Sequence, residues 1–239
     1  MTGIYLELSR EQIENIIGFL GYGNPEESVW FVGIEEGFGK ATTKDAIENL
    51  NARGSFQEIV DLRDAHHLKL KERGVLIDFD AKPPYTPVWQ WIAKVMCASS
   101  ESDWREYIKS SLGRTSGETF LTELSPIPSS KAADKVWAEA LQRLDAKQTE
   151  KIERRKRALL QLIDEKRPHM VICYGNGKVK AREFEKFFGL EWTPIGTGIS
   201  KDSKRACPFL LLPFFGNGQM NQRVIEELRR LNLLPAQRT

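Results

Sequence analysis

Two adjacent carboxylates, Glu35 and Glu36, follow an apolar run near the start of the chain. The run, Val29–Val32, holds only β-branched and aromatic residues, which is typical of a strand buried on both faces. A parallel strand of this kind brings the residues after it to the carboxyl edge of the sheet, where open α/β sheets bind ligands. Carboxylates are costly in a core but useful in a cleft. We therefore expect Glu35 and Glu36 to line a cleft; the alternative is a tight turn whose glutamates face water.

Three further apolar runs end in polar or glycine-rich sequence. We expect each run to form a strand, and the three strands with their polar ends span residues 118–126, 169–177 and 209–219. Their polar ends hold Glu123, Asn176, Asn217 and Gln219. Because the carboxyl ends of parallel strands meet at one edge of a sheet, we expect these side chains to share a cleft with the two glutamates.

Helical patterns separate the four expected strands. We expect helices over residues 9–20, 42–54, 56–73, 86–96, 150–166 and 178–188, a short one within 100–117 and a last one ending at 231. Pro213 indicates a free edge or a break in the fourth strand. Alternating strands and helices predict an α/β fold, a three-layer α/β/α sandwich with a central, mostly parallel four-stranded sheet. We expect one domain over residues 1–239, since no repeat or linker divides the chain.

The segment that precedes the helix at residue 86 offers a further candidate for ligand binding. Three prolines between residues 83 and 87 form a stiff loop around Tyr85. A tyrosine held in this way stacks readily on a planar ligand. The alternative is a tyrosine at the rim that covers the core.

Composition excludes several classes of protein. The chain has 239 residues, a net charge of +2, three separated cysteines and three histidines, so we expect no metal site, no iron–sulfur cluster and a cytoplasmic location. Gly175–Gly177 lacks the full spacing of a dinucleotide fingerprint, and we expect no cofactor. No apolar run is long enough to span a membrane. For the oligomeric state, we expect a monomer. We interpret His66 and His67 as surface residues on a helix, and the basic cluster within residues 151–157 as a solvated face rather than a phosphate contact.

The order of these segments resembles that of the uracil-DNA glycosylase superfamily over roughly residues 25 to 235. Five segments carry the resemblance: Phe31–Gly37, Pro84–Thr86, Thr122–Pro126, Arg167–Gly175 and Phe214–Gly218. The first is similar to the catalytic motif in which a strand enters a loop that positions water. The second is similar to the segment whose aromatic ring stacks on the flipped base, the third to the strand end that reads the base. The fourth resembles a proline-led strand that runs into a glycine, and the last falls where the family has its second catalytic motif.

The resemblance assigns roles to particular residues. It places Glu35 as the residue that activates water, with Glu36 and Asn217 as further catalytic candidates. Gly33, Ile34, Gly37, Tyr85, Glu123, Asn176 and Gln219 are the expected contacts to the base or ligand.

Two positions depart from the pattern. Glu123 stands where the family has an asparagine, and an ionised glutamate would accept hydrogen bonds from a base edge that donates them. Phe214 or Phe215 stands near the expected histidine, which removes a donor for a leaving uracil oxygen. Uracil specificity therefore does not follow from the resemblance.

As a hypothesis, the resemblance implies a DNA glycosylase that hydrolyses the N-glycosidic bond of a flipped damaged or deaminated base. Its partner is then DNA or a nucleotide. The alternative is a non-catalytic module that recognises a nucleotide or a nucleic-acid end with the same cleft. A third hypothesis is hydrolysis of a small nucleoside-like substrate, which needs no DNA.

Overall fold

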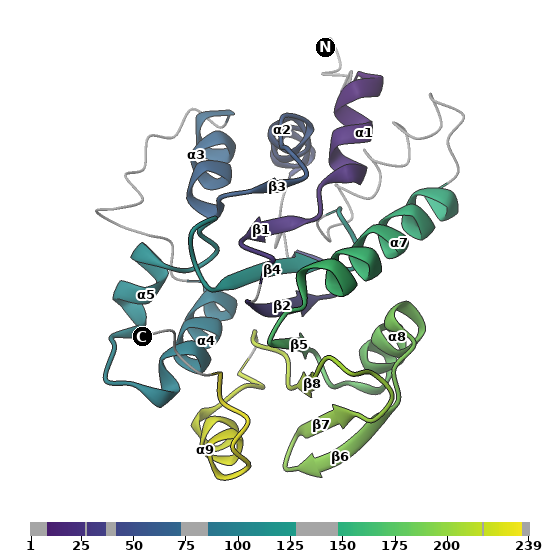
Figure 1. Cartoon of the computed structure of the whole chain (residues 1–239). Helices are drawn as coiled ribbons and strands as arrows, with labels where there is room; N and C mark the ends of the chain where they lie inside the picture. Colours follow the sequence, from purple (N-terminus) through teal and green to yellow (C-terminus); the bar gives the residue numbers. More distant parts are fainter. Residues whose placement is uncertain are drawn as a thin grey trace.

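The part of the chain that the structure describes forms a mixed sheet of eight strands, in the order β3-β1-β4-β2-β5-β8-β7-β6 (Figure 1). The computed structural model describes residues 9–26, 28–36, 42–72, 86–127, 148–216 and 218–235. The strands are β1 (Gly21–Gly23), β2 (Val29–Gly33), β3 (Ile59–Val60), β4 (Thr119–Glu123), β5 (Met170–Tyr174), β6 (Trp192–Gly196), β7 (Ile199–Asp202) and β8 (Phe209–Leu212). The helices in these ranges are α1 (Arg10–Gly18), α2 (Thr43–Gly54), α3 (Leu62–Glu72), α4 (Pro87–Met96), α5 (Trp104–Ser110), α7 (Gln148–Lys166), α8 (Lys178–Phe188) and α9 (Gln222–Arg230), with a 3-10 turn, η1 (Cys97–Ser99), after α4.

The four strands expected from the sequence form the centre of this sheet. β4, β2, β5 and β8 are neighbours in that order, and each pair of neighbours is parallel. Gly33 pairs with Glu123 at the carboxyl ends of β2 and β4. The residues after Gly33 and the Glu123 side chain therefore start from the same edge of the sheet.

The sheet is larger than the four strands that the sequence predicted, and it is mixed. On one side, β1 pairs antiparallel with β4 and parallel with β3. On the other side, β7 pairs antiparallel with both β8 and β6. β1 and β3 have three and two residues, too few to show an alternating pattern. β6 holds Pro194 and has two exposed positions, so its sequence lacks the apolar run of the central strands.

Alternate residues of the central strands face two separate apolar layers. Phe31, Leu121 and Ile172 pack in the layer to which α4, α5 and α9 contribute. Trp30 and Phe120 pack in the other layer, to which α7 and α8 contribute. Helices therefore cover both faces of the central strands, as the alternation of strands and helices predicts. α1, α2 and α3 gather beside the end of the sheet that β1 and β3 form (Figure 1).

Several local predictions are confirmed and one is corrected. Side-chain caps begin α1 at Ser9, α2 at Thr42 and α4 at Thr86. The helix expected over residues 56–73 begins only at Leu62, because β3 precedes it. Of the two alternatives for Pro213, the break is confirmed, because β8 ends at Leu212, and the free edge is excluded, because β8 has a neighbour on each side.

Candidate active site

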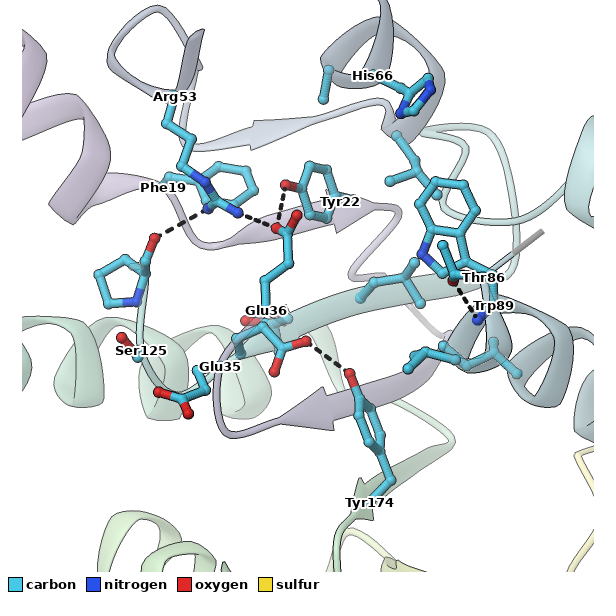
Figure 2. A pocket seen from close by; sticks show the side chains of 18 of the residues that line it. Phe19, Tyr22, Glu35, Glu36, Arg53, His66, Thr86, Trp89, Ser125 and Tyr174 are labelled. Atoms are coloured by element: carbon cyan, nitrogen blue, oxygen red, sulfur yellow. Dashed lines mark hydrogen bonds and ion pairs between the residues drawn. The ribbon is translucent and has the colours of Figure 1, made fainter. Parts of the chain in front are cut away.

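A cavity of about 750 Å³ lies at the carboxyl ends of β2 and β4 (Figure 2). Its size lies within the range of small-molecule sites. Its rings come from Phe19, Tyr22, His66, Trp89, Tyr174 and Phe214. Its charged and amide side chains are Glu35, Glu36, Asn49, Arg53, Lys69, Glu123 and Arg155. The cavity thus joins aromatic walls with a dense polar cluster, a combination suited to a planar, hydrogen-bonding ligand.

The two adjacent glutamates have different surroundings. Glu35 is exposed, and no hydrogen bond or ion pair joins it to another described residue. Glu36 points toward Tyr22 and Arg53, whereas Glu35 points away from them (Figure 2). Of the pair, Glu35 has the carboxylate that no other described side chain engages, so it is available to water or to a ligand.

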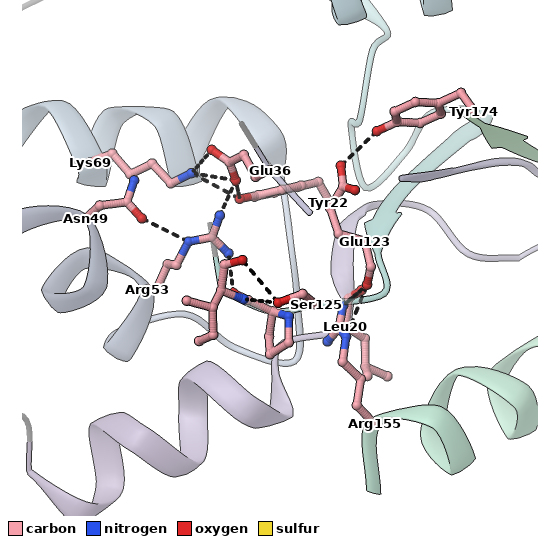
Figure 3. Close-up of polar contacts among 12 residues, drawn as sticks. Leu20, Tyr22, Glu36, Asn49, Arg53, Lys69, Glu123, Ser125, Arg155 and Tyr174 are labelled. Atoms are coloured by element: carbon pink, nitrogen blue, oxygen red, sulfur yellow. Dashed lines mark hydrogen bonds and ion pairs between the residues drawn. The ribbon is translucent and has the colours of Figure 1, made fainter. Parts of the chain in front are cut away.

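Glu36 is held in an ionic cluster between α2 and α3 (Figure 3). Its carboxylate pairs with Arg53, accepts a hydrogen bond from Lys69 Nζ at 3.0 Å and lies 3.4 Å from the Tyr22 hydroxyl. Asn49 Oδ1 accepts from Arg53 Nε at 3.0 Å, which fixes the guanidinium. Burial raises the pKa of Glu36, but Lys69 and Arg53 outweigh burial and hold that pKa at about 2. Glu36 is therefore ionised and a weak base, and the two cations leave the cluster one net positive charge.

Glu123 forms a hydrogen-bonded pair with Tyr174, the last residue of β5 (Figure 3). The Tyr174 hydroxyl donates to Glu123 Oε1 at 2.7 Å. Glu123 Oε2 is buried and has no partner among the described residues. Burial raises the pKa of Glu123 to about 8, although the Tyr174 hydrogen bond acts in the opposite direction. A pKa raised to about 8 favours the neutral carboxylic acid at neutral pH, and in that form Glu123 can donate a hydrogen bond as well as accept one, unlike the ionised form considered from the sequence.

Arg155 also corrects a prediction. It lies in the basic cluster expected to face solvent, yet its exposure is only 2%. Its guanidinium donates to the carbonyl oxygens of Phe19, Leu20, Glu123 and Leu124. α7 is long enough to place one arginine of the cluster against the sheet, while Arg154 beside it points outward to Glu14 with 60% of its side chain exposed. Arg155 thus ties the end of β4, and with it Glu123, to the segment after α1.

The two histidines on α3 are not both plain surface residues. Both are half-buried, and His66 lines the cavity. Its ring lies edge-on to the ring of Trp89, with 6.1 Å between the two ring centroids. Burial and then the charge of Lys69 lower the pKa of His66 to about 4. His66 is therefore a neutral wall of the cavity at physiological pH.

The other predicted site residues lie in different places. Gly33 touches Glu123, since a Cβ on Gly33 would overlap the Glu123 carboxyl group and lie 2.6 Å from the Tyr174 hydroxyl oxygen. Ile34 packs against the apolar layer of α7 and α8. Asn176 donates to Gly198 O at 3.3 Å in a second, shallower hollow beside α8, and exposed Gln219 is not among the residues that line the main cavity. Gly37, Tyr85 and Asn217 lie outside the described residues.

The sequence interpretation missed most of the polar partners in the cavity. Tyr174 had a usable signal, because it ends an expected strand just as Glu123 does. The sequence contains no comparable signal for Arg53 and Lys69, because they reach the cavity from α2 and α3, far along the chain from Glu123.

The described ranges contain neither a cluster of metal-ligating side chains nor a helix suited to a membrane. No group of three or more histidine, cysteine or acidic side chains there is arranged to hold a metal ion. None of the helices in these ranges combines the length and the apolar character that crossing a bilayer requires.

Comparison with known proteins adds no family. The chain matches no protein-family model, and a search of curated proteins finds no match to it. The resemblance to the uracil-DNA glycosylase superfamily therefore remains a prediction from the order of the motifs, and the function has to be argued from the cavity itself.

Proposed function

We propose that this protein takes a nucleobase into the cavity and hydrolyses its N-glycosidic bond, as a DNA glycosylase does. One observation carries the proposal: the register of β2 and β4 brings an accessible carboxylate, Glu35, and a neutral carboxyl group, Glu123, to one aromatic-walled cavity. Glycoside hydrolysis is usually carried out by a pair of carboxyl groups that face one site, one acting as a general acid and the other as a nucleophile or base.

In the proposed reaction the target nucleotide leaves the base stack and its base enters the cavity. The aromatic walls contact the faces of the base, and Glu123 faces its edge. As the bond from C1′ to the base lengthens, positive charge grows on the sugar, and the carboxylate of Glu35 stabilises that charge and orients the attacking water. Stacking by Tyr85 and assistance by Asn217 remain predictions for residues outside the described ranges.

Base release from oligonucleotides tests the proposal. The substrates contain uracil, hypoxanthine, xanthine or an alkylated base, in single and double strands, and wild type is compared with Glu35→Gln. We expect release of at least one base, reduced about a hundredfold or more in Glu35→Gln. Glu101→Gln, at an exposed glutamate that does not line the cavity, is the matched control and keeps the wild-type rate. Absence of release from the whole panel by folded protein would exclude the glycosylase proposal.

A second candidate function is recognition without cleavage. The observation that favours it is the Glu36 cluster, in which one carboxylate is paired with two cations, Arg53 and Lys69. The cluster therefore has a net positive charge that would attract an anionic ligand. A nucleotide that binds with equal affinity to wild type and Glu35→Gln, with no turnover by either, would support this function. Steep loss of DNA binding with added salt would separate a DNA ligand from a small nucleoside.

A further inference from the structure

The two carboxyl oxygens of Glu123 are not equivalent. Oε1 accepts the Tyr174 hydroxyl at 2.7 Å, whereas Oε2 is buried in the cavity wall with no partner among the described residues. A buried polar atom without a partner is uncommon in folded proteins and calls for a specific explanation. A ligand atom that pairs with Oε2 supplies one.

The surrounding backbone fixes the Glu123 carboxyl group in place. Gly33 is its partner on β2, and the absence of a Cβ on Gly33 makes the space that the carboxyl group occupies. The Tyr174 hydroxyl donates a hydrogen bond to the same carboxyl group. Burial and the neighbouring Glu123 raise the pKa of Tyr174, so its hydroxyl keeps its proton and remains a donor. Oε2 is thus held in one position before any ligand arrives.

The charged groups around Glu123 determine where its proton lies. Burial raises its pKa to about 8, Tyr174 opposes this by donating a hydrogen bond, and Glu36 adds to the rise. Arg53 and Arg155 lower the pKa without reversing the shift. Because the Tyr174 hydroxyl already donates to Oε1, the proton of the neutral acid belongs on Oε2, the oxygen without a partner in the described part of the chain.

We propose that Glu123 is the general acid of the reaction, that Tyr174 is its positioning residue and that the leaving group is a purine. The proposal rests on the proposed function. The proton passes from Oε2 to a ring nitrogen of the purine, and the electron pair of the bond between C1′ and the base returns to the base, which leaves neutral. The water oxygen bonds to C1′ and loses its proton to Glu35, and solvent restores both carboxyl groups. A purine fits this step because it offers ring nitrogens with free lone pairs, whereas uracil leaves as an anion.

Single-turnover release of hypoxanthine and of uracil between pH 6 and pH 10 tests the proposal. We expect the wild-type rate for hypoxanthine to fall about tenfold per pH unit above about pH 8, as Glu123 loses its proton. Glu123→Gln keeps the shape but has no proton to transfer, so its hypoxanthine release falls about a hundredfold at pH 7 and the alkaline decline disappears. Release of uracil, if present, is affected much less. Glu101→Gln serves again as the exposed control.

Two variants move the alkaline decline in opposite directions. Tyr174→Phe removes a hydrogen bond that lowers the pKa of Glu123, so the decline moves to higher pH. Glu36→Gln removes a nearby negative charge that raises this pKa, so the decline moves to lower pH. A purely structural role for Tyr174 would lower the rate at every pH without moving the decline.

A readout that needs no activity comes from stability against pH. Unfolded Glu123 ionises near its ordinary pKa of 4.5, whereas folded Glu123 keeps its proton up to about pH 8. Folded wild type therefore loses stability as pH rises through this window, and the thermal midpoint of Glu123→Gln falls less steeply. Parallel curves, or an unchanged hypoxanthine profile in Glu123→Gln, would overturn the role of Glu123 and leave the glycosylase proposal standing. Failure of wild type to release any base would instead remove the glycosylase proposal, and this inference with it.

Discussion

Replacement of Arg155 by methionine gives the sharpest test of the architecture around the cavity. Methionine keeps an unbranched, flexible apolar stem in place of the arginine stem, so the change removes the guanidinium and the hydrogen bonds that it donates. The side chain is 2% exposed on α7. Its loss separates the β4 end from the segment between α1 and β1, the two pieces of chain that it joins (Figure 3).

The magnitude follows from the contacts of the guanidinium. Its Nη2 donates to Glu123 O at 2.7 Å and its Nε to Leu124 O at 3.2 Å, and further bonds reach Phe19 O and Leu20 O. Hydrogen bonds from a charged donor contribute about 1.5–3 kcal/mol each, and their loss leaves buried carbonyl groups unpaired. Burial of the cation opposes this, and it lowers the pKa of Arg155 to about 9. Because these terms partly offset, we expect Arg155→Met to lower the free energy of unfolding by about 3–5 kcal/mol.

Urea denaturation followed by circular dichroism measures this change. Arg154→Met is the matched control, because Arg154 is the preceding residue, 60% exposed, and paired with Glu14 at 2.9 Å. We expect that control to change the free energy of unfolding by less than about 1 kcal/mol. Equal and small effects from both variants would refute the reasoning, since they would mean that the buried guanidinium contributes no more than a surface charge.

Three further predictions concern single residues. Gly33→Ala places a methyl group on the Glu123 carboxyl group, so we expect a loss of about 1–3 kcal/mol in urea unfolding together with loss of ligand binding; full retention of both would contradict the packing described. Glu36, whose pKa falls from 4.5 unfolded to about 2 folded, adds stability that is present above pH 4.5 and is lost as pH falls toward 2. After screening by solvent we expect about 1–2 kcal/mol, seen as a shallower acid transition in Glu36→Gln, and identical acid transitions would refute it. Thr42→Ala removes the cap of α2 and should cost about 1 kcal/mol in thermal unfolding, whereas an unchanged midpoint would mean that the capping bond adds nothing.

The sequence alone determined the centre of the fold. Four apolar runs became β2, β4, β5 and β8, because a strand buried on both faces needs a continuous apolar segment that is visible without any partner. Helix starts were equally visible, since Ser9 and Thr42 cap helices through contacts three residues away. The outer strands were not visible, because strands of two or three residues, or a strand with a proline and exposed positions, are defined by pairing with a neighbour.

The same division holds for the cavity. Glu35, Glu36 and Glu123 were found because each ends a recognisable strand, and the parallel register brings such ends together. Only the tertiary structure decided their chemistry, since burial made Glu123 a neutral acid, and Lys69 and Arg53 kept Glu36 ionised. A carboxyl group's protonation state depends on burial and on charges a few ångströms away, and those neighbours arrive from distant parts of the chain.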